Sequence, residues 1–227
     1  MVRKTFKQDK CKSYLKELHN KKIRKMYEKK CKSNVVDFGN ITLITRESVD
    51  DGNCFFDSVY RLLNKRYSYR NMLKLRKDIS KKFTMKEYLL VNDGLLALEA
   101  ISDYLPHPEN IHDTTSLKRQ VRGLNKDDKE EVLITLEDNL EDLQSSLKED
   151  GEWAEEWMIY FTSKILKVNI VIYNDDAQQF QMVKKINKRY PFILLYNYSE
   201  THFEPLVDTD NNKIFRYKDI KEGLINI

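Results

Sequence analysis

The spacing of apolar residues changes near residue 168, and this change constrains the fold more than any other feature of the chain. Before it, apolar residues recur every three to four positions, which is the period of a helix with one buried face. After it, Val168, Ile170 and Ile172 recur at every second position, as in a β-strand. Helices followed by strands predict an α+β or three-layer domain, with a small central sheet packed between helical layers.

The extended part of the chain predicts four strands and a short final segment, over Val168–Tyr173, Phe180–Val183, Phe192–Tyr196, His202–Val207 and Ile214–Tyr217. The third strand is apolar throughout and should be central. Pro205 cannot donate a ladder hydrogen bond, which predicts that the fourth strand lies at an edge or is bulged. One further extended segment, Ile41–Ile44, is expected after a turn at residues 35–39.

The helical part predicts six helices, at residues 4–33, 54–64, 69–83, 84–104, about 127–150 and 153–166. Asn92-Asp93-Gly94 is a signal for a break in the fourth. Trp153 opens the last helix and belongs to its apolar pattern. His107 lies between two prolines on a loop, and we interpret it and His112 as surface residues.

Cys54 follows a turn and opens a helix. Asp51, Gly52 and Asn53 are typical turn residues, and an apolar-periodic segment begins directly after them. The N–H groups of a first helical turn favour negative charge, which predicts a lowered pKa for the Cys54 thiol and donors for an oxyanion. The alternative is a buried cysteine that acts only as a small hydrophobe. The presence or absence of a histidine that could act as its base decides between a nucleophilic and a purely structural Cys54.

His202 is the candidate partner. In a strand, His202 and Glu204 share one face, with backbones about 7 Å apart. A carboxylate there could accept from one imidazole nitrogen and present the other nitrogen to a thiol. The alternative is a surface histidine beside a strand glutamate.

Length and composition restrict the class of protein. The chain has 227 residues, enough for one large domain or a domain with one appendage, and its 33% charged and 41% hydrophobic residues are typical of a soluble globular protein. There is no apolar run of about 18 residues for a membrane span, and no signal peptide at the start. Three cysteines with wide spacings argue against a disulfide framework and for an intracellular, reducing compartment. Cys11, His19 and Cys31 match no zinc pattern, so we expect no metal and no cofactor.

Charge is segregated along the chain. Residues 1–33 contain 13 Lys or Arg and 3 Asp or Glu, whereas residues 127–156 contain 13 acids and 2 lysines. Such segregation predicts a face for a charged partner, or simply two solvated helix faces. The basic segment could lie on nucleic acid, but no recognised binding motif accompanies it, and a peripheral helix packed on the domain is the alternative.

Three sequence blocks in order resemble the ovarian tumour (OTU) family of papain-like cysteine proteases, which are deubiquitinases: Asp51–Phe56, Gly151-Glu152-Trp153 ahead of Val168–Tyr173, and His202–Leu206. The resemblance covers roughly residues 42–208. It implies a papain-like OTU fold with the nucleophile at a helix N-terminus. We expect this domain to span residues 41–227 with an acidic helical arm at about 127–150, and a basic N-terminal helical extension over residues 1–40 to pack on it.

The resemblance also implies an activity. Members hydrolyse the isopeptide bond between the ubiquitin C-terminus and a lysine through an acyl-enzyme, so Cys54 would be the nucleophile and His202 the general base and acid. The Asp51 turn with the Cys54 amide would form the oxyanion hole. The family usually has Asn or Asp two residues after the histidine. Glu204 is one methylene longer, so Glu204, Asp51, Asp50 or a residue of another loop orients the imidazole.

The expected partner is ubiquitin, polyubiquitin or a ubiquitin-like modifier, bound by a monomer. The substrate-binding candidates are Gly52, Asn53, Trp153 and Phe203, with Trp153 either lining a channel for the ubiquitin tail or belonging to the core. The acidic arm would dock ubiquitin. High Lys and Asn content suggests a pathogen protein acting in the host cytosol. Two alternatives remain: a catalytically weak or inactive ubiquitin-binding relic, and a basic nucleic-acid-binding protein built around residues 1–33.

Overall fold

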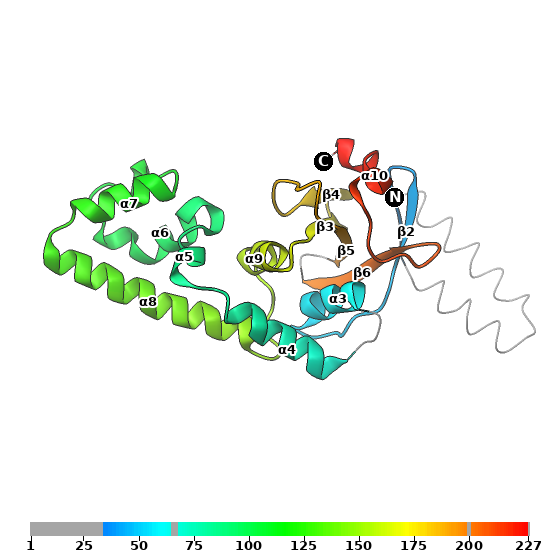
Figure 1. Cartoon of the computed structure of the whole chain (residues 1–227), viewed down its shortest axis with the longest axis horizontal. Coiled ribbons are helices and arrows are strands. Elements are labelled where there is room, and N and C mark those ends of the chain that lie inside the picture. The colour runs from blue at the N-terminus through cyan, green and yellow to red at the C-terminus, as the bar shows by residue number, and fades with distance from the viewer. Residues whose placement is uncertain (1–33, 65–67, 199–200, 227) are drawn as a thin grey trace, which may run out of the picture.

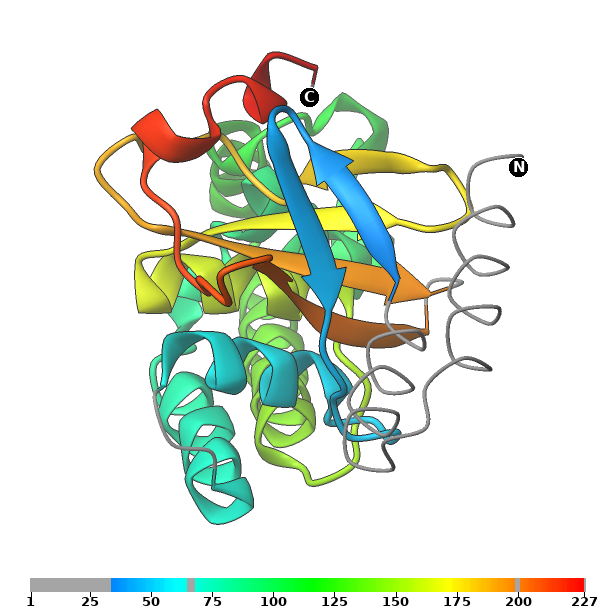
Figure 2. The same cartoon turned by 90° about the vertical axis from the view of Figure 1, so that its right-hand side faces the viewer.

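The computed structural model describes residues 34–64, 68–198 and 201–226. Its centre is a six-stranded sheet in the order β1-β2-β6-β5-β3-β4 (Figures 1 and 2). The strands are β1 (Val35–Phe38), β2 (Ile41–Thr45), β3 (Asn169–Asn174), β4 (Gln179–Met182), β5 (Phe192–Tyr198) and β6 (His202–Asp208). The pair β3–β5 is parallel, and the other neighbouring pairs are antiparallel.

Most of the extended segments form as predicted, and β5 is interior to the sheet. Two details differ. The expected turn at residues 35–39 is instead the strand β1, which forms a hairpin with β2. The expected final strand is reduced to a single bridge between Phe215 and Phe192. Of the helical extension predicted over residues 1–40, residues 1–33 lie outside the described residues, and the last part is not an extension, because Val35–Phe38 forms β1 of the sheet.

The prediction that the Pro205 strand is an edge or bulged strand is wrong, because β6 lies between β2 and β5 in unbroken register. The Pro205 carbonyl accepts from the Arg46 N–H at 2.9 Å, on the β2 side. The N–H and C=O of one strand residue point to the same side, so the missing donor of Pro205 also faces β2. The pairing of β2 with β6 ends at Leu206, so the missing donor of Pro205 falls at the end of that ladder and leaves the pairing of β6 with β5 intact.

The sheet is covered on both faces. On one face lie α3 (Cys54–Leu63), α4 (Tyr69–Ser80) and α9 (Glu156–Leu166), whose apolar residues join Ile170, Ile193 and Val207 in the larger core. On the other face a smaller core forms around Tyr173, Leu194 and Tyr196, closed by Phe215 and by Ile220 of α10 (Tyr217–Ile220). This is the predicted α+β arrangement, with the Cys54 helix packed on the sheet (Figure 2).

A helical arm extends away from the sheet (Figure 1). It contains α5 (Met85–Tyr88), α6 (Leu95–Ile101), α7 (Thr114–Gly123) and the long acidic helix α8 (Lys126–Lys148), with short turns η1 (Val91–Gly94), η2 (Ser102–Tyr104) and η3 (Pro108–Asn110). The helix expected over 84–104 is broken where signalled, because Asn92 and Asp93 adopt left-handed φ values of 48° and 55°. The last described element is η4 (Gly223–Asn226).

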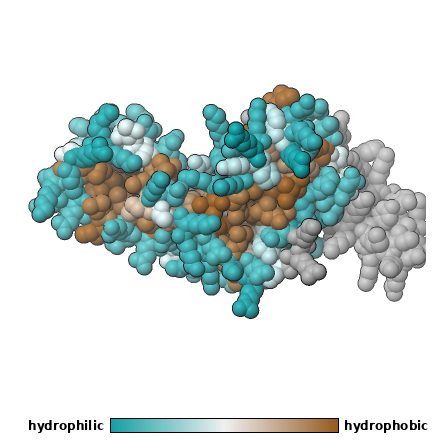
Figure 3. All heavy atoms as spheres, in the orientation of Figure 1, coloured by the Kyte–Doolittle hydropathy of each residue, from teal (hydrophilic) through white to brown (hydrophobic). Residues whose placement is uncertain are grey.

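Apolar side chains also show at the surface of the arm (Figure 3), where the exposed ones include Leu90, Leu95, Leu133 and Ile134. Among the helices of the described ranges, none is long and apolar enough to cross a membrane.

Candidate active site

Cys54 is the first residue of α3, as predicted, and a tight turn precedes it. The Asp51 carboxylate accepts from the Asn53 N–H at 2.8 Å, and the Asp51 carbonyl accepts from the Cys54 N–H at 3.0 Å. The turn therefore forms as its residue types require. The Cys54 amide already has a partner in it, so its use as an oxyanion donor requires the Asp51 peptide to rotate.

The Cys54 sulfur lies against the backbone on both sides of His202. Its Sγ accepts from the Phe203 N–H at 3.4 Å, and the thiol faces the Thr201 carbonyl at 3.9 Å. Helix α3 and the first residues of β6 are nearly 150 positions apart in the sequence, and the fold brings them together. Among the described residues, the thiol and the imidazole do not hydrogen-bond directly in this resting arrangement.

Burial raises the pKa of the Cys54 thiol above its ordinary value. The Phe203 and Phe55 N–H groups lower it in part, and the carboxylates of Asp51 and Asp50 raise it further. The prediction of a lowered pKa from the helix N-terminus is therefore wrong for this resting state, because the side chain is only 1% exposed and desolvation dominates. The thiol is protonated at neutral pH, and a base has to remove its proton.

The His202 ring lies partly buried between acidic groups. Its Nε2 is 3.9 Å from Glu204 Oε1, and its buried Nδ1 is 3.8 Å from Asp50 Oδ1 and has no hydrogen-bond partner. The other Glu204 oxygen accepts from the Tyr198 hydroxyl at 2.9 Å. Glu204 and Asp50 therefore flank the ring without hydrogen-bonding to it, while the Asp51 carboxylate is engaged in the turn.

A residue that the sequence did not single out also contacts the ring. Ser48, between β2 and α3, places its Oγ 3.4 Å from His202 Nε2. The next residue, Val49, donates its N–H to Asp57 Oδ2 at 3.1 Å, and the same oxygen accepts from Arg61 Nε at 2.5 Å. The buried Asp57 thus fixes the Ser48 segment to α3.

Arg76 is a second residue near the site that was not predicted from the sequence. It is fully buried and donates to Asn53 Oδ1 at 2.6 Å. It also donates to three backbone carbonyls at 3.0–3.1 Å, those of Glu152, Leu147 and Ser146. Its guanidinium lies 4.4 Å from the centroid of the Phe56 ring. Burial lowers the pKa of Arg76 to about 10, so it is charged at neutral pH. Arg76 joins the turn before Cys54 to the end of α8. A charged residue between Met72 and Ile79 on the apolar side of α4 was the available signal.

Two of the expected substrate-binding residues have structural roles. The Asn53 side chain is fully buried and, besides accepting from Arg76, donates to Asp150 Oδ1 at 2.7 Å and to the Tyr69 hydroxyl at 3.2 Å. The prediction that the Asn53 side chain contacts substrate is therefore wrong. Gly52 is required for close approach, since a Cβ atom there would lie 1.6 Å from the Gly151 carbonyl oxygen.

The two aromatic residues expected to bind substrate, Phe203 and Trp153, differ in their exposure. Phe203 is 5% exposed, and its ring packs edge-on against Phe55 with centroids 5.5 Å apart, so the prediction of a side-chain contact with substrate is wrong. Trp153 lies before α9 rather than in it and is 48% exposed, so its interpretation as a core residue is wrong. Trp153 is free to meet a substrate. Within the described ranges, no group of three or more His, Cys, Asp and Glu residues is arranged to hold a metal ion.

A helical thiol beside a histidine on a neighbouring strand is the arrangement of the papain-like cysteine proteases. A model of the OTU-like cysteine protease family matches residues 49–203, and the chain belongs to this family. No match was found among curated protein sequences.

Several solved structures are similar to this chain. An OTU domain in complex with ubiquitin is 16% identical over 84% of this chain and 86% of its own, with a TM-score of 0.50. An OTU deubiquitinase from Wolbachia pipientis wMel is 14% identical over 74% of this chain and 90% of its own, with a TM-score of 0.40. The viral OTU protease from Qalyub virus is 19% identical over 77% of this chain and 99% of its own, with a TM-score of 0.40.

Proposed function

We propose that the protein is a deubiquitinase, a cysteine-dependent hydrolase of the isopeptide bond at the ubiquitin C-terminus. The observation that carries the proposal is the contact of the Cys54 sulfur with the peptide groups on both sides of His202. Family membership supports the chemistry, and the structural relative in complex with ubiquitin supports the substrate.

In the proposed reaction, His202 Nδ1 takes the proton of the Cys54 thiol. The sulfur attacks the carbonyl carbon of the last ubiquitin residue, and the lysine amine leaves with the proton that the imidazole returns to it. Water, deprotonated by the same imidazole, then hydrolyses the thioester. The thiol has to move from its contact with the Thr201 carbonyl toward Nδ1, which is buried and has no other hydrogen-bond partner.

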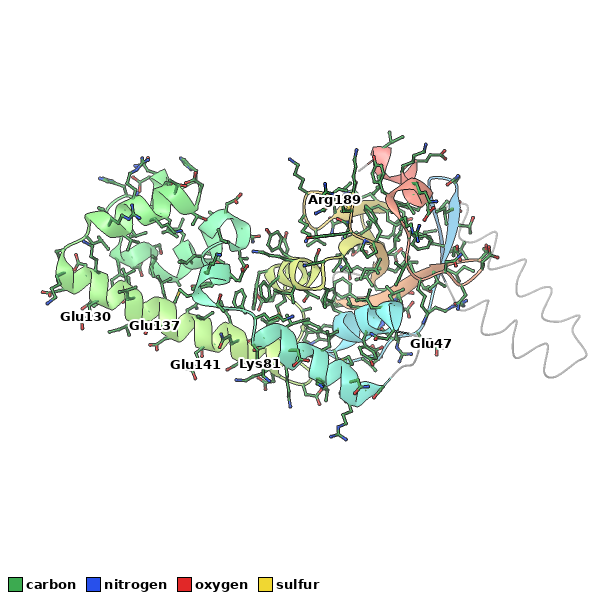
Figure 4. All side chains as sticks on the ribbon, viewed as in Figure 1. Glu47, Lys81, Glu130, Glu137, Glu141 and Arg189 are labelled. Atoms are coloured by element: carbon green, nitrogen blue, oxygen red, sulfur yellow. The ribbon has the colours of Figure 1, made fainter. Side chains whose placement is uncertain are left out.

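We also propose that the acidic helix α8 docks ubiquitin. Glu130, Glu137 and Glu141 form a stripe along its outer side (Figure 4), and Ile134, 52% exposed, lies within that stripe at helical spacing. Acidic groups around an exposed apolar residue suit a partner with a basic rim and an apolar patch, which ubiquitin has. Trp153, exposed beside the Gly52–Gly151 contact, is the proposed wall for the ubiquitin tail.

Diubiquitin of every linkage type tests the function. We expect cleavage of at least one linkage by the full chain and none by the Cys54→Ala and His202→Ala variants. Binding of ubiquitin without any cleavage would instead support an inactive ubiquitin-binding relic.

A further inference from the structure

The Ser48 hydroxyl has contacts that determine where its hydrogen lies. Its Oγ is 2.5 Å from the Phe203 carbonyl oxygen, 3.4 Å from the Val49 carbonyl oxygen and 3.4 Å from His202 Nε2. A carbonyl oxygen can only accept a hydrogen bond. Two oxygens at 2.5 Å repel unless a hydrogen lies between them, so Ser48 donates to Phe203.

This donation leaves only lone pairs on Ser48 Oγ for the imidazole. The Nε2 atom of His202 must then carry its hydrogen to interact favourably with Ser48. A neutral imidazole has one N–H, so Nδ1 keeps its lone pair. Nδ1 is also the buried ring nitrogen without a hydrogen-bond partner, as a base awaiting a proton should be.

The carboxylates beside the ring do not fix this choice. Glu204 Oε1 is 3.9 Å from Nε2 and Asp50 Oδ1 is 3.8 Å from Nδ1, both beyond hydrogen-bonding distance. The other Glu204 oxygen is engaged by Tyr198. Asp50 is fully exposed. These acids contribute charge around the ring, whereas Ser48 is the group with a defined hydrogen-bond direction.

We propose that Ser48 is the positioning residue for His202, which fixes the tautomer with hydrogen on Nε2 and leaves Nδ1 to receive the Cys54 proton. The catalytic consequence rests on the proposed function. The tautomer itself is a property of the resting protein and is measurable without substrate.

Ser58 offers a matched control. Its hydroxyl donates to the same Phe203 carbonyl at 3.0 Å, but the imidazole is not among its contacts. A purely structural role for Ser48 would make Ser48→Ala and Ser58→Ala behave alike. Ser48→Thr keeps a hydroxyl in place and should rescue the loss.

Nitrogen-15 NMR of the imidazole rings, in mildly alkaline buffer, reads the tautomer. Signals of His202 are assigned by their loss in His202→Gln. We expect a single tautomer with pyrrole-type Nε2 and pyridine-type Nδ1 in the wild-type chain, in Ser48→Thr and in Ser58→Ala, and a mixture of tautomers in Ser48→Ala. The opposite tautomer in the wild type, or no change in Ser48→Ala, would overturn the proposal.

Turnover of a ubiquitin C-terminal amide provides the second readout. Ser48→Ala should lower kcat about tenfold and change KM less than about twofold, as expected for loss of one hydrogen bond to the reacting group. Ser58→Ala and Ser48→Thr should stay within about threefold of the wild-type kcat. Equal losses in Ser48→Ala and Ser58→Ala would contradict the proposal. An inactive wild type with the predicted tautomer pattern would reject the deubiquitinase function while supporting the role of Ser48.

Discussion

At the scale of single residues, the nucleophile Cys54 is a neutral thiol in the resting site. Desolvation raises the pKa of Cys54, and the nearby Asp51 and Asp50 carboxylates raise it further. The thiolate has to form when substrate is present, by transfer of the proton to His202. A thiol kept neutral in this way is protected from oxidation, because the thiolate is the reactive form.

This account predicts how the resting cysteine reacts with iodoacetamide. In a Cys11→Ser, Cys31→Ser background, the alkylation rate should still increase above pH 8, because the raised pKa of Cys54 places the thiolate at alkaline pH. Asp51→Asn keeps the side-chain oxygen that caps the turn but removes its charge. It should therefore lower the pKa of Cys54 and speed alkylation at pH 8 by roughly two- to threefold.

Asp142→Asn, on the exposed surface of α8, is the control and should not change the alkylation rate. An alkylation rate already at its plateau at neutral pH would show that Cys54 rests as a thiolate, contrary to this account.

At the scale of elements, Arg76 connects α4, the turn before α3 and the end of α8. Its four hydrogen bonds go to Asn53 and to three backbone carbonyls, and the Arg76 side chain itself is fully buried. Removing the guanidinium leaves the buried acceptors on Asn53 and Leu147 unpaired. The cost of unpaired buried groups exceeds the net value of the bonds themselves.

We therefore predict that Arg76→Met lowers the free energy of unfolding by about 3 kcal/mol. Urea denaturation measures this change. Arg70→Met, at an exposed position on the same helix, is the matched control and should change it by less than about 0.5 kcal/mol. Equal effects of the two substitutions would mean that Arg76 does not act as a clamp.

The acidic stripe of α8 makes a second prediction at this scale. Substituting Glu130, Glu137 and Glu141 together by Lys should raise KM for ubiquitin substrates about tenfold at low salt, with kcat little changed. The difference from wild type should shrink at high salt, because the stripe is exposed and its charges are screened. Reversal of Asp176, Asp210 and Glu222, exposed acids outside α8, is the control. A loss independent of salt would argue against electrostatic docking.

At the scale of the whole molecule, several tyrosines couple stability to alkaline pH. Burial raises the pKa of Tyr88 to about 12, and burial with the nearby Glu204 raises that of Tyr198 to about 12. In the unfolded chain these groups titrate near pH 10. The unfolded state therefore releases protons between about pH 10 and 12 while the folded state retains them, and stability falls as pH rises across that range.

We expect the free energy of unfolding to decrease by on the order of 2 kcal/mol for each such buried tyrosine between about pH 10 and 12. Urea denaturation across this range, with phenolate absorbance of the folded protein, measures it. Tyr88→Phe should reduce the slope. A flat profile would show that these hydroxyls titrate normally.

The complete fold also shows which of its parts can be predicted from local sequence patterns. The Cys54 helix, the β3 and β5 strands and the acidic helix follow from local apolar periodicity, and the Cys54–His202 partnership follows from the resemblance of the blocks around them. Ser48 and Arg76 were missed because their partners, Phe203 and Leu147, are 155 and 71 positions away. Trp153 was misplaced because its apolar pattern continues into α9, whereas the helix begins only at Glu156.

The same reasoning explains the other differences. Pro205 lies inside the sheet because its missing N–H faces β2 at the end of the β2–β6 ladder, whereas its other side pairs with β5, and local sequence does not reveal this placement. The thiol pKa was predicted from the helix terminus alone, whereas the burial that dominates it comes from packing of α3 against β6.

The most direct test of the central claim is reaction with ubiquitin that carries an electrophile at its C-terminus, followed by peptide mass spectrometry. We predict one covalent adduct, located on Cys54, which is absent in Cys54→Ala and forms far more slowly in His202→Ala. An adduct on another residue, or equal labelling of the wild type and His202→Ala, would contradict a cysteine activated by this histidine.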